Sequence, residues 1–283
     1  MNDRSMKGRF LYGTSSWSEK SWVGPFYPKA TAPAEMLSFY ATRFVTVEAD
    51  TTYYRIPPRE MVRGWARKTP EGFVLSAKFP RSVVHGGEAE KPDGEKVLVP
   101  KHVGGEVERF LEVMGELREK CGPLVIQLPY FNKTAFASEG AFLERLEPFL
   151  ETLPEGFRYG VEVRNKNWIG EALLAILRRR KIALVLVDLV YMPHPADLAK
   201  ELDLVTADFA YARLIGDRKA VEERTETFDR IVLDQSDRLA RWAELLRELI
   251  PRVRETFAYA NNHYAGFGPE TADVLKRLVE QIA

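Results

Sequence analysis

Cysteine is almost absent from this sequence, in which Cys121 is the only one among 283 residues. A single thiol excludes an intrachain disulfide and a cluster of thiolate metal ligands. Long hydrophobic runs are missing too, because no stretch approaches the roughly 18 apolar residues that span a membrane. An excess of one charge sign is also lacking, since 41 basic residues balance 41 acidic ones. Overall electrostatics therefore gives no support to a nucleic-acid or membrane partner, although local basic patches stay open.

Targeting signals and familiar catalytic motifs are scarce as well. The first ten residues, MNDRSMKGRF, lack the apolar run of a secretory signal, so we expect a cytoplasmic protein. The sequence contains no GxSxG, P-loop or GxGxxG pattern, which disfavours serine hydrolases, ATPases and NAD enzymes. Its four histidines, at 85, 102, 194 and 263, show no HxH spacing. We therefore predict no resident metal or cofactor, while a loosely bound Mg²⁺ or Mn²⁺ on carboxylate oxygens stays open.

What is present is an alternation of short apolar runs with longer amphipathic ones. The short runs predict strands at 10–15, 44–50, 73–78, 124–129, 159–164, 183–188, 211–216 and 257–262. The longer runs predict helices at 33–43, 58–68, 104–120, 139–151, 168–180, 234–250 and 269–282, with a weaker candidate at 194–200. Strands that alternate with helices are typical of parallel βαβ units. Eight such strands predict an α/β fold, a TIM (β/α)8 barrel that forms a single domain over residues 1–283.

Two features of the connections bear on that fold. An open doubly wound sheet is the alternative, but the turn after the first strand has no glycine-rich fingerprint, and its helix is delayed by WSEKSWVGPFYPKAT. Residues 79–103 form the one long segment without a predicted element, between the third strand and its helix. Loops of that length are usually functional lids or disordered excursions.

Polar side chains gather at the carboxyl ends of the predicted strands. Residues two apart in a strand share a face, so Glu162 and Arg164 point the same way and Val163 points the other. Charged or amide side chains stand near the ends of most other strands, namely Glu48, Asp50, Lys78, Gln127, Asp188, Arg213 and Asn261. Barrel active sites lie at this end of the strands, which we call the rim. The sequence therefore predicts a polar cleft at the rim, with a purely structural network of paired charges as the alternative.

Seven segments resemble the motifs of one known family. GTSSWSEKSWVGPFYP, VEADTTYYRIP and WARKTPEGFVLSAKFPRSVVH are similar, in this order, to the first three motifs of the DUF72 family, also called YecE-like proteins. LVIQLP, YGVEVRNKNW, YARLIGDR and YANNHYAGFGPETA resemble four more, so the likeness spans roughly residues 8 to 275. The resemblance implies a TIM barrel, related by fold to endonuclease IV and to sugar isomerases. It implies no particular activity, because fold does not transfer function.

The resemblance also places individual residues. Its motif positions fall on Trp17, Trp22, Glu48, Tyr54, Lys78, His85, Gln127, Glu162, Arg164, Trp168, Asp188, Arg213, Asn261 and Asn262. The sequence departs from the family pattern at Ser16, Glu19, Asp50, Tyr53, Asn165 and Ile215. Asn165 stands where a histidine is common, and Ile215 interrupts a usual Leu-His-Gly. A mechanism that needs a histidine at either place is therefore disfavoured.

Together, these residues favour an enzyme that hydrolyses or rearranges a polar, phosphorylated or sugar-containing substrate. We predict Glu48, Glu162 and Asp188 as catalytic, with the two glutamates as an acid–base pair. The predicted substrate-binding residues are Trp17, Tyr54, Lys78, His85, Gln127, Arg164, Trp168, Arg213, Asn261 and Asn262. Arginine grips phosphate or carboxylate through paired hydrogen bonds, and we expect the aromatic rings to pack on the substrate.

Other functions stay open at this point. Glycoside hydrolysis would use a pair of carboxylates, but the large barrel glycosidase clan has its acids at strands four and seven, where this sequence has Gln127 and Arg213. A metal-assisted reaction would use the carboxylates with His85 or His263. A non-catalytic protein that binds a nucleic acid or a phosphorylated metabolite would need the cations but not Glu162. The sequence predicts no oligomeric state.

Overall fold

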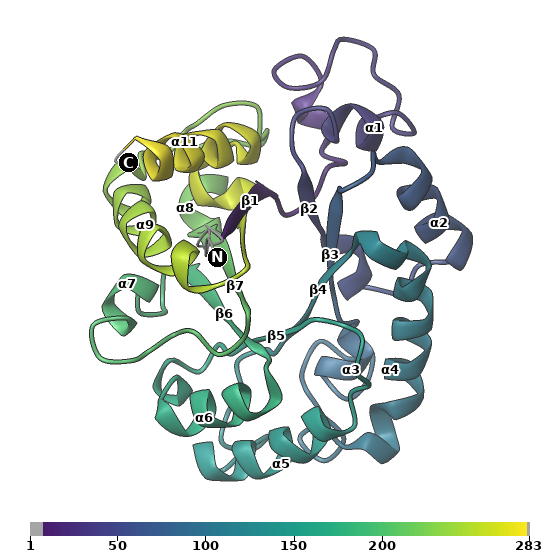
Figure 1. The fold of residues 1–283 in the computed structure, drawn as a ribbon, viewed down its shortest axis with the longest axis vertical. Coiled ribbons are helices and arrows are strands. Elements are labelled where there is room, and N and C mark those ends of the chain that lie inside the picture. Colours follow the sequence, from purple (N-terminus) through teal and green to yellow (C-terminus); the bar gives the residue numbers. More distant parts are fainter. Residues whose placement is uncertain (1–7, 282–283) are drawn as a thin grey trace, which may run out of the picture. The chain divides into compact units, whose positions relative to one another are not determined.

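The computed structural model describes residues 8–281. Its strands are β1 (Arg9–Thr14), β2 (Thr46–Ala49), β3 (Val74–Lys78), β4 (Cys121–Gln127), β5 (Tyr159–Glu162), β6 (Ala183–Leu189), β7 (Phe209–Gly216) and β8 (Glu255–Ala260). They are ordered β1-β8-β7-β6-β5-β4-β3-β2, so consecutive strands from β2 to β8 are neighbours and β8 pairs with β1. Helices alternate with these strands along the chain (Figure 1). The predicted α/β fold class, the TIM (β/α)8 type, is confirmed.

The helices that connect the strands differ widely in length. The α-helices are α1 (Met36–Tyr40), α2 (Arg59–Lys68), α3 (Arg81–Val84), α4 (Pro100–Met114), α5 (Glu139–Glu151), α6 (Glu171–Arg180), α7 (Pro195–Leu198), α8 (Arg218–Glu222), α9 (Ser236–Leu249), α10 (Asn262–Ala265) and α11 (Gly268–Glu280). Short 3-10 helices are η1 (Lys20–Trp22), η2 (Asp50–Tyr53), η3 (Gly115–Lys120), η4 (Lys166–Trp168) and η5 (Ile250–Arg252). Several of the shortest helices directly follow a strand, so they begin at the carboxyl ends of the sheet.

The described residues fall into two compact units. Unit 1 is drawn from Met1–Val47 and Ala183–Ala283 and contains β1, β6, β7 and β8. Unit 2 is Glu48–Ile182 and contains β3, β4 and β5. The expectation of one domain over residues 1–283 stays a prediction.

Unit 1 is built on a parallel ladder of β1, β8, β7 and β6. All seven residues of β6 are buried, which is typical of a parallel strand covered on both faces. On one face, Tyr211 and Tyr259 pack together with ring centroids 5.1 Å apart. Helices α9 and α11 of this unit lie side by side (Figure 1), and Trp242 of α9 is fully buried. Side chains at the carboxyl ends of these strands therefore project from a closely packed frame.

Unit 2 has its own parallel ladder of β3, β4 and β5. Helix α5 begins where the hydroxyl of Ser138 accepts a hydrogen bond of 3.2 Å from the backbone N–H of Ala141. Helix α6 buries one apolar stripe and ends at Arg180, because the next residue, Lys181, has a left-handed backbone that terminates the helix. The ring centroids of Phe79 and Phe110 are 4.8 Å apart, and this contact packs α4 near the end of β3.

Most predicted elements are confirmed, and the main difference lies in the segment 79–103. Each of the eight predicted strands overlaps an observed one. The supposed loop contains α3 and the first residues of α4, because Pro100 starts the helix four residues before the predicted position. Proline is well suited to the first helical turn, where its missing N–H costs no hydrogen bond. The stretch without helix or strand is therefore limited to residues 85–99.

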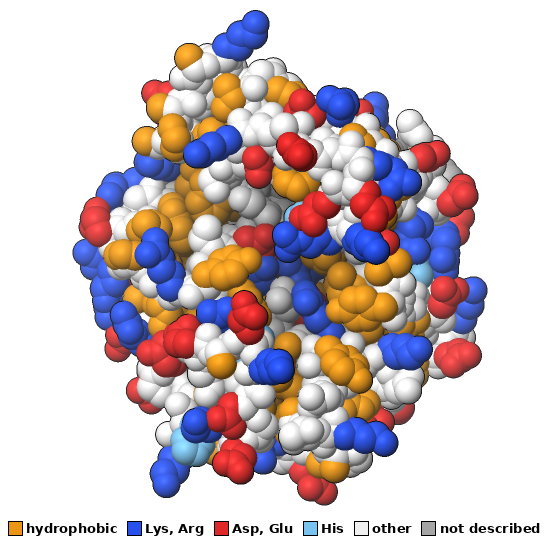
Figure 2. All heavy atoms as spheres, turned by 180° about the vertical axis from the view of Figure 1, so that it is seen from behind, with side chains coloured by type: hydrophobic (Ala, Val, Ile, Leu, Met, Phe, Trp, Pro, Cys, Tyr) orange, Lys and Arg blue, Asp and Glu red, His pale blue; other side chains and the backbone are white. Residues whose placement is uncertain are grey.

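The surface carries both charge signs. Figure 2 shows Lys and Arg side chains interspersed with Asp and Glu on the face that it draws, which agrees with the balanced composition. Within residues 8–281, no helix has the length and apolar character needed to cross a membrane. Recognition of a charged ligand must therefore depend on how a few side chains are arranged, and not on overall charge.

Candidate functional site

Strand register brings three predicted site residues of unit 2 to one face. Gln127 and Glu162 are the last residues of β4 and β5 and are directly paired. Lys78, the last residue of β3, is paired with Val125, two residues before Gln127. Because residues two apart share a face, Lys78, Gln127 and Glu162 lie on the same side of the sheet. All three are buried, so three polar side chains end adjacent strands inside the protein.

Glu162 and Arg164 form the first ion pair of this site. Glu162 is fully buried, and its Oε1 accepts a hydrogen bond of 2.9 Å from the Nε of Arg164. The Arg164 side chain keeps 25% of its surface exposed. No further hydrogen bond or ion pair joins Arg164 to another residue in the described part of the chain. Its two terminal amino groups are therefore available to an acceptor from outside the protein.

Lys78 and Asp50 form a second ion pair in unit 2. Asp50 lies in η2, directly after β2, and its carboxylate contacts the Nζ of Lys78. The same Nζ lies 5.8 Å from the ring centroid of Tyr53, within reach of a cation–π contact. Lys78 is buried, so the carboxylate and the ring together replace much of its lost hydration.

Tyr53 and His85 complete the arrangement, which we call the strand-end cluster: Asp50, Tyr53, Lys78, His85, Glu162 and Arg164. The Tyr53 hydroxyl and the Nε2 of His85 are 2.9 Å apart. Burial raises the pKa of Tyr53, although Arg164 and Arg81 oppose this shift. Burial also lowers the pKa of His85, and the same two arginines lower it further. Both side chains are therefore neutral at pH 7, and a proton can move along the hydrogen bond between them.

Three other predicted residues of unit 2 have different surroundings. Glu48 of β2 is fully buried and has further polar partners. Tyr54 is 67% exposed and packs edge-on against Tyr53, with ring centroids 5.5 Å apart. Trp168 stacks on Phe142 at 4.7 Å and so helps to hold η4 against α5. Tyr54 is accessible to a ligand, whereas one face of Trp168 is occupied by the protein.

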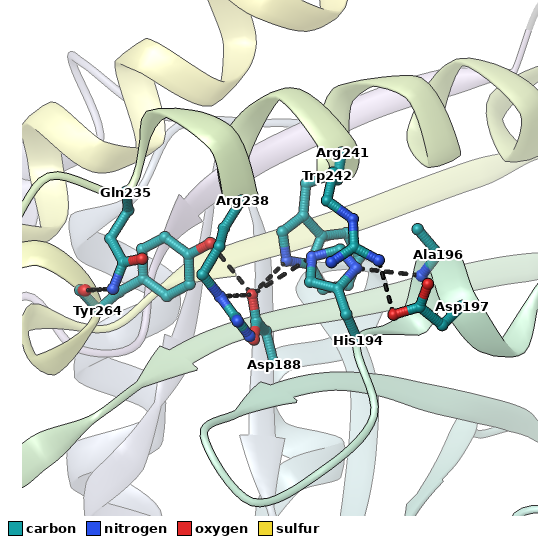
Figure 3. A network of polar contacts seen from close by, with 9 residues as sticks. All are labelled: Asp188, His194, Ala196, Asp197, Gln235, Arg238, Arg241, Trp242 and Tyr264. Carbon is teal, nitrogen blue, oxygen red and sulfur yellow. Dashed lines mark hydrogen bonds and ion pairs between the residues drawn. The ribbon is translucent and has the colours of Figure 1, made fainter.

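Asp188 of unit 1 lies near the end of β6, as predicted, but on the face opposite to Arg213. In the ladder, Val187 pairs with Arg213 and Asp188 pairs with Leu214, so Asp188 and Arg213 occupy opposite faces of the sheet. Its carboxylate meets the helix layer, as Figure 3 shows. The expectation that Asp188 shares a ring of charges with Arg213 is therefore wrong, because β6 contributes Val187 to that face.

The partners of Asp188 form what we call the Asp188 network: Asp188, His194, Arg238, Trp242 and Tyr264. Asp188 is fully buried and accepts hydrogen bonds from Trp242 Nε1 at 2.9 Å and from Tyr264 Oη at 3.1 Å. The guanidinium of Arg238 forms an ion pair with the same carboxylate (Figure 3). A carboxylate with this many donors is held by α9 and α10 and is well suited to a structural role.

His194 closes this network from the loop after β6. Its Nδ1 accepts a hydrogen bond of 3.2 Å from the backbone N–H of Ala196, and its Nε2 lies 3.5 Å from Asp188 Oδ2. Burial lowers the pKa of His194 to about 4, although the nearby Asp188 carboxylate acts in the opposite direction. His194 is therefore neutral at pH 7, with the proton on Nε2 facing Asp188.

The remaining predicted residues of unit 1 are held by local contacts. Arg213 of β7 is 2% exposed and has polar partners. Asn261 accepts a hydrogen bond from the backbone N–H of His263 and so caps α10. Asn262 Oδ1 accepts from Trp22 Nε1 at 3.2 Å and from the backbone N–H of Gly268 at 2.9 Å. The carbonyl of Trp17 accepts from the Tyr27 hydroxyl. The side-chain oxygens of both asparagines therefore serve the fold.

A metal centre has no ready set of ligands. Within residues 8–281, no group of three or more His, Cys, Asp and Glu side chains could hold a metal ion. A loosely bound Mg²⁺ or Mn²⁺ stays a prediction.

Three residues in or next to the strand-end cluster were not predicted as site residues: Asp50, Tyr53 and Arg81. The sequence places Asp50 near a strand end but among no predicted site residues, Tyr53 stands out only as a departure from a family pattern, and Arg81 does not stand out at all. All three lie directly after a strand, in η2 or at the start of α3. Position after a strand end was therefore the available signal, because loops at the rim carry many barrel active sites.

A (β/α)8 fold whose strands end in buried charged side chains defines the class of this molecule as a TIM-barrel protein. The chain belongs to the family described as "Protein of unknown function DUF72", whose model matches residues 11–283. This confirms the resemblance found in the sequence motifs.

Individual relatives agree with the family. The chain is 31% identical over 159 residues to the "UPF0759 protein YecE" of Escherichia coli strain K12, a match that covers 56% of this chain and 50% of YecE. The chain therefore matches about half the length of this curated relative. A DUF72 family protein from Thermotoga maritima is 28% identical, with a TM-score of 0.74 over 96% of this chain and 99% of that one. One from Enterococcus faecalis, 20% identical, has a TM-score of 0.67 over 98% of this chain and all of its own, and shows the fold alone.

Proposed function

We propose that this protein is an enzyme that transfers protons on a small anionic substrate, which it hydrolyses or rearranges. The substrate is polar and carries a phosphate or a sugar. The reaction takes place at the strand-end cluster of unit 2 and needs no resident cofactor, although a loosely held Mg²⁺ or Mn²⁺ would suit an anionic substrate. We also propose that the protein acts in the cytoplasm.

The observation that carries this proposal is the pair formed by Glu162 and Arg164. A buried carboxylate bonded to a partly exposed guanidinium combines a base with a group that can hold an anion. If the pair were purely structural, Arg164 would be expected to use its terminal amino groups as well. It makes no second hydrogen bond or ion pair with any residue of the described part of the chain.

The roles within the cluster follow from charge and position. Glu162 is the acid–base residue, and Arg164 holds the anionic group of the substrate. Tyr53 and His85 form a neutral pair that can donate a proton as the base removes one. Lys78 supplies a positive charge that its partner Asp50 fixes in place.

Several predicted residues have a lesser part in the proposal. Glu48 and Gln127 belong to the same buried layer of strand ends, and Tyr54 offers an exposed ring for the substrate to pack on. We do not include Asp188, because its carboxylate is directed at α9 and α10. One ring face of Trp168 and the side-chain oxygens of Asn261 and Asn262 already contact the protein. Only the other ring face and the amide N–H groups remain for a substrate.

A non-catalytic protein that binds a phosphorylated metabolite is the second candidate. It is favoured by the two ion pairs, which could hold an anion without any chemistry. The two functions differ in what Glu162→Gln does. In a binding protein, Glu162→Gln would leave ligand binding intact. In an enzyme, the same substitution would abolish turnover and preserve ligand binding.

A thermal-shift screen tests the proposal without an assay for turnover, because a ligand that binds the native state raises the melting temperature. The wild-type protein would be screened against sugars, sugar phosphates and nucleotides, and each active compound retested on Arg164→Ala. We expect the shift to disappear in that variant. The matched control is Arg67→Ala, which removes an arginine from an exposed ion pair with Glu60. A shift that persists in Arg164→Ala, or vanishes equally in both variants, would contradict a site at the cluster.

A further inference from the structure

Arg81 is an arginine without a close partner. It begins α3, three residues after Lys78, and only 26% of its side-chain surface is exposed. Its Nε atom is buried and has no hydrogen-bond partner. The nearest carboxylate is that of Glu88, whose oxygen lies 4.0 Å from an Arg81 amino group and whose side chain is 74% exposed. In the described part of the chain, the guanidinium of Arg81 makes no other ion pair and no hydrogen bond.

This isolation is costly for a guanidinium. A charged donor that is buried without an acceptor loses hydrogen bonds to water and gains none from the protein, which destabilises the fold. The two cations of the strand-end cluster each have a carboxylate partner: Lys78 contacts Asp50, and Arg164 is bonded to Glu162. An unsatisfied buried donor in a folded protein calls for an explanation, and a ligand that supplies the acceptor is one.

The position of Arg81 points to the same ligand that Arg164 would hold. Its helix places Arg81 one turn before His85, whose backbone N–H bonds to the Arg81 carbonyl at 2.8 Å. His85 in turn contacts Tyr53. Arg81 and Arg164 both act electrostatically on this Tyr53–His85 pair. Both guanidiniums therefore lie within electrostatic range of one pair of neutral side chains.

We propose that Arg81 determines substrate specificity by binding, together with Arg164, the phosphate group of a phosphate monoester. This rests on the proposed function, which it narrows from anionic compounds in general to phosphate esters. A carboxylate has two oxygens and is satisfied by one bidentate arginine. A phosphate monoester presents three terminal oxygens and close to two negative charges, which suit two guanidiniums. Arg81 is thus the residue that separates phosphate esters from carboxylates.

Inorganic phosphate is the probe that tests this assignment. Binding would be followed by ³¹P NMR line broadening and by calorimetry for the wild type, Arg81→Gln, Arg81→Lys and the control Arg67→Gln. We expect phosphate to bind at least roughly tenfold more weakly to Arg81→Gln, because charge-assisted hydrogen bonds are lost. Arg81→Lys should be intermediate, since lysine offers one point charge. Acetate should bind equally to the wild type and to Arg81→Gln.

The melting temperature of Arg81→Gln provides a second readout, because a ligand-binding role and a structural role predict opposite changes. Removal of a partly exposed guanidinium whose buried Nε has no acceptor should leave the melting temperature of Arg81→Gln, without ligand, unchanged or higher. A clear drop in melting temperature together with unchanged phosphate binding would overturn the inference.

The remaining outcomes separate this inference from the proposed function. Phosphate binding that is lost in Arg164→Ala but retained in Arg81→Gln would refute the role of Arg81 and leave the strand-end cluster as the site. An absence of phosphate binding, alongside a compound from the thermal-shift screen that still requires Arg164, would refute the phosphate assignment alone. Phosphate binding indifferent to both arginines would overturn both proposals.

Discussion

The Nε of Arg164 donates a hydrogen bond of 2.9 Å to Oε1 of Glu162, and the two residues are unequally exposed. Glu162 is fully buried at the end of β5, whereas Arg164 keeps a quarter of its surface accessible. A buried carboxylate thus faces a cation that also reaches solvent. The ion pair offsets part of the cost of burying the carboxylate, and the proposed function assigns the exposed part of Arg164 to a ligand.

The first prediction concerns the stability of this pair. Arg164→Ala removes a charge-assisted hydrogen bond from a buried carboxylate, so we expect it to lower the free energy of unfolding by about 1–3 kcal/mol. Glu162→Gln should be milder, because the amide oxygen can still accept the hydrogen bond. Urea denaturation measures both values. If Arg164→Ala were as stable as the wild type, the pair would contribute nothing to the fold.

The second prediction concerns the Asp188 network. Asp188→Ala leaves the donors of Trp242 and Tyr264 buried without their acceptor, and it leaves Arg238 without its carboxylate. We expect a loss of about 3–5 kcal/mol in the free energy of unfolding. The control Asp208→Ala removes only an exposed ion pair with Arg254 and should change stability little. A loss below about 1 kcal/mol for Asp188→Ala would contradict the structural role that the contacts indicate.

The third prediction concerns the pH dependence of stability. The pKa of a histidine is about 6.5 in an unfolded chain, and burial lowers that of His194 to about 4. Between these pH values the unfolded chain binds more protons than the folded one, so stability falls as the pH drops from 6.5 towards 4. The groups that face the imidazole are Asp188, Asp197, Arg238 and Arg241.

Substitution of His194 isolates this effect from the titration of other groups. We expect His194→Gln to lose less stability than the wild type when urea denaturation at pH 7.5 is repeated at pH 5. His102→Gln, at an exposed position of α4, is the control and should follow the wild type. Equal losses in all three proteins would show that His194 stays protonated in the folded state or titrates normally.

The fourth prediction concerns the single thiol. Burial raises the pKa of Cys121 to about 11, so only a minute fraction is thiolate at pH 8. Because the thiolate is the reactive form, the native protein should react with a disulfide reagent on the order of 100-fold more slowly than the urea-unfolded protein. Absorbance of the released thiol follows both rates. Equal rates would place Cys121 in an environment different from the one described.

The sequence specified the order of elements well because hydrophobic periodicity is a local property. Each strand candidate is a short apolar run, and each run overlaps a strand of the structure. The predicted helix begins at residue 104, four residues after α4 begins at Pro100. Periodicity alone therefore locates an element more securely than its first residue.

The site was less predictable because it depends on register and on partners distant in the sequence. Alternation within β6 indicated that Asp188 points opposite to Val187, but only the pairing of Val187 with Arg213 shows which face is which. Likewise, the residues next to Arg81 in the sequence do not indicate that its Nε lacks an acceptor. The Nε of Arg164 has one, the carboxylate of Glu162. Such facts arise from tertiary packing.

The most direct test of the central claim is a turnover measurement on Glu162→Gln. Each compound that raises the melting temperature would be incubated with wild-type protein and with the variant, and substrate and product followed by ¹H and ³¹P NMR. The account predicts that the wild type converts at least one compound and that Glu162→Gln binds it but converts it at least 100-fold more slowly, the usual scale for loss of a general acid–base. Equal conversion by both proteins, or binding without any conversion by the wild type, would contradict an enzyme that uses Glu162.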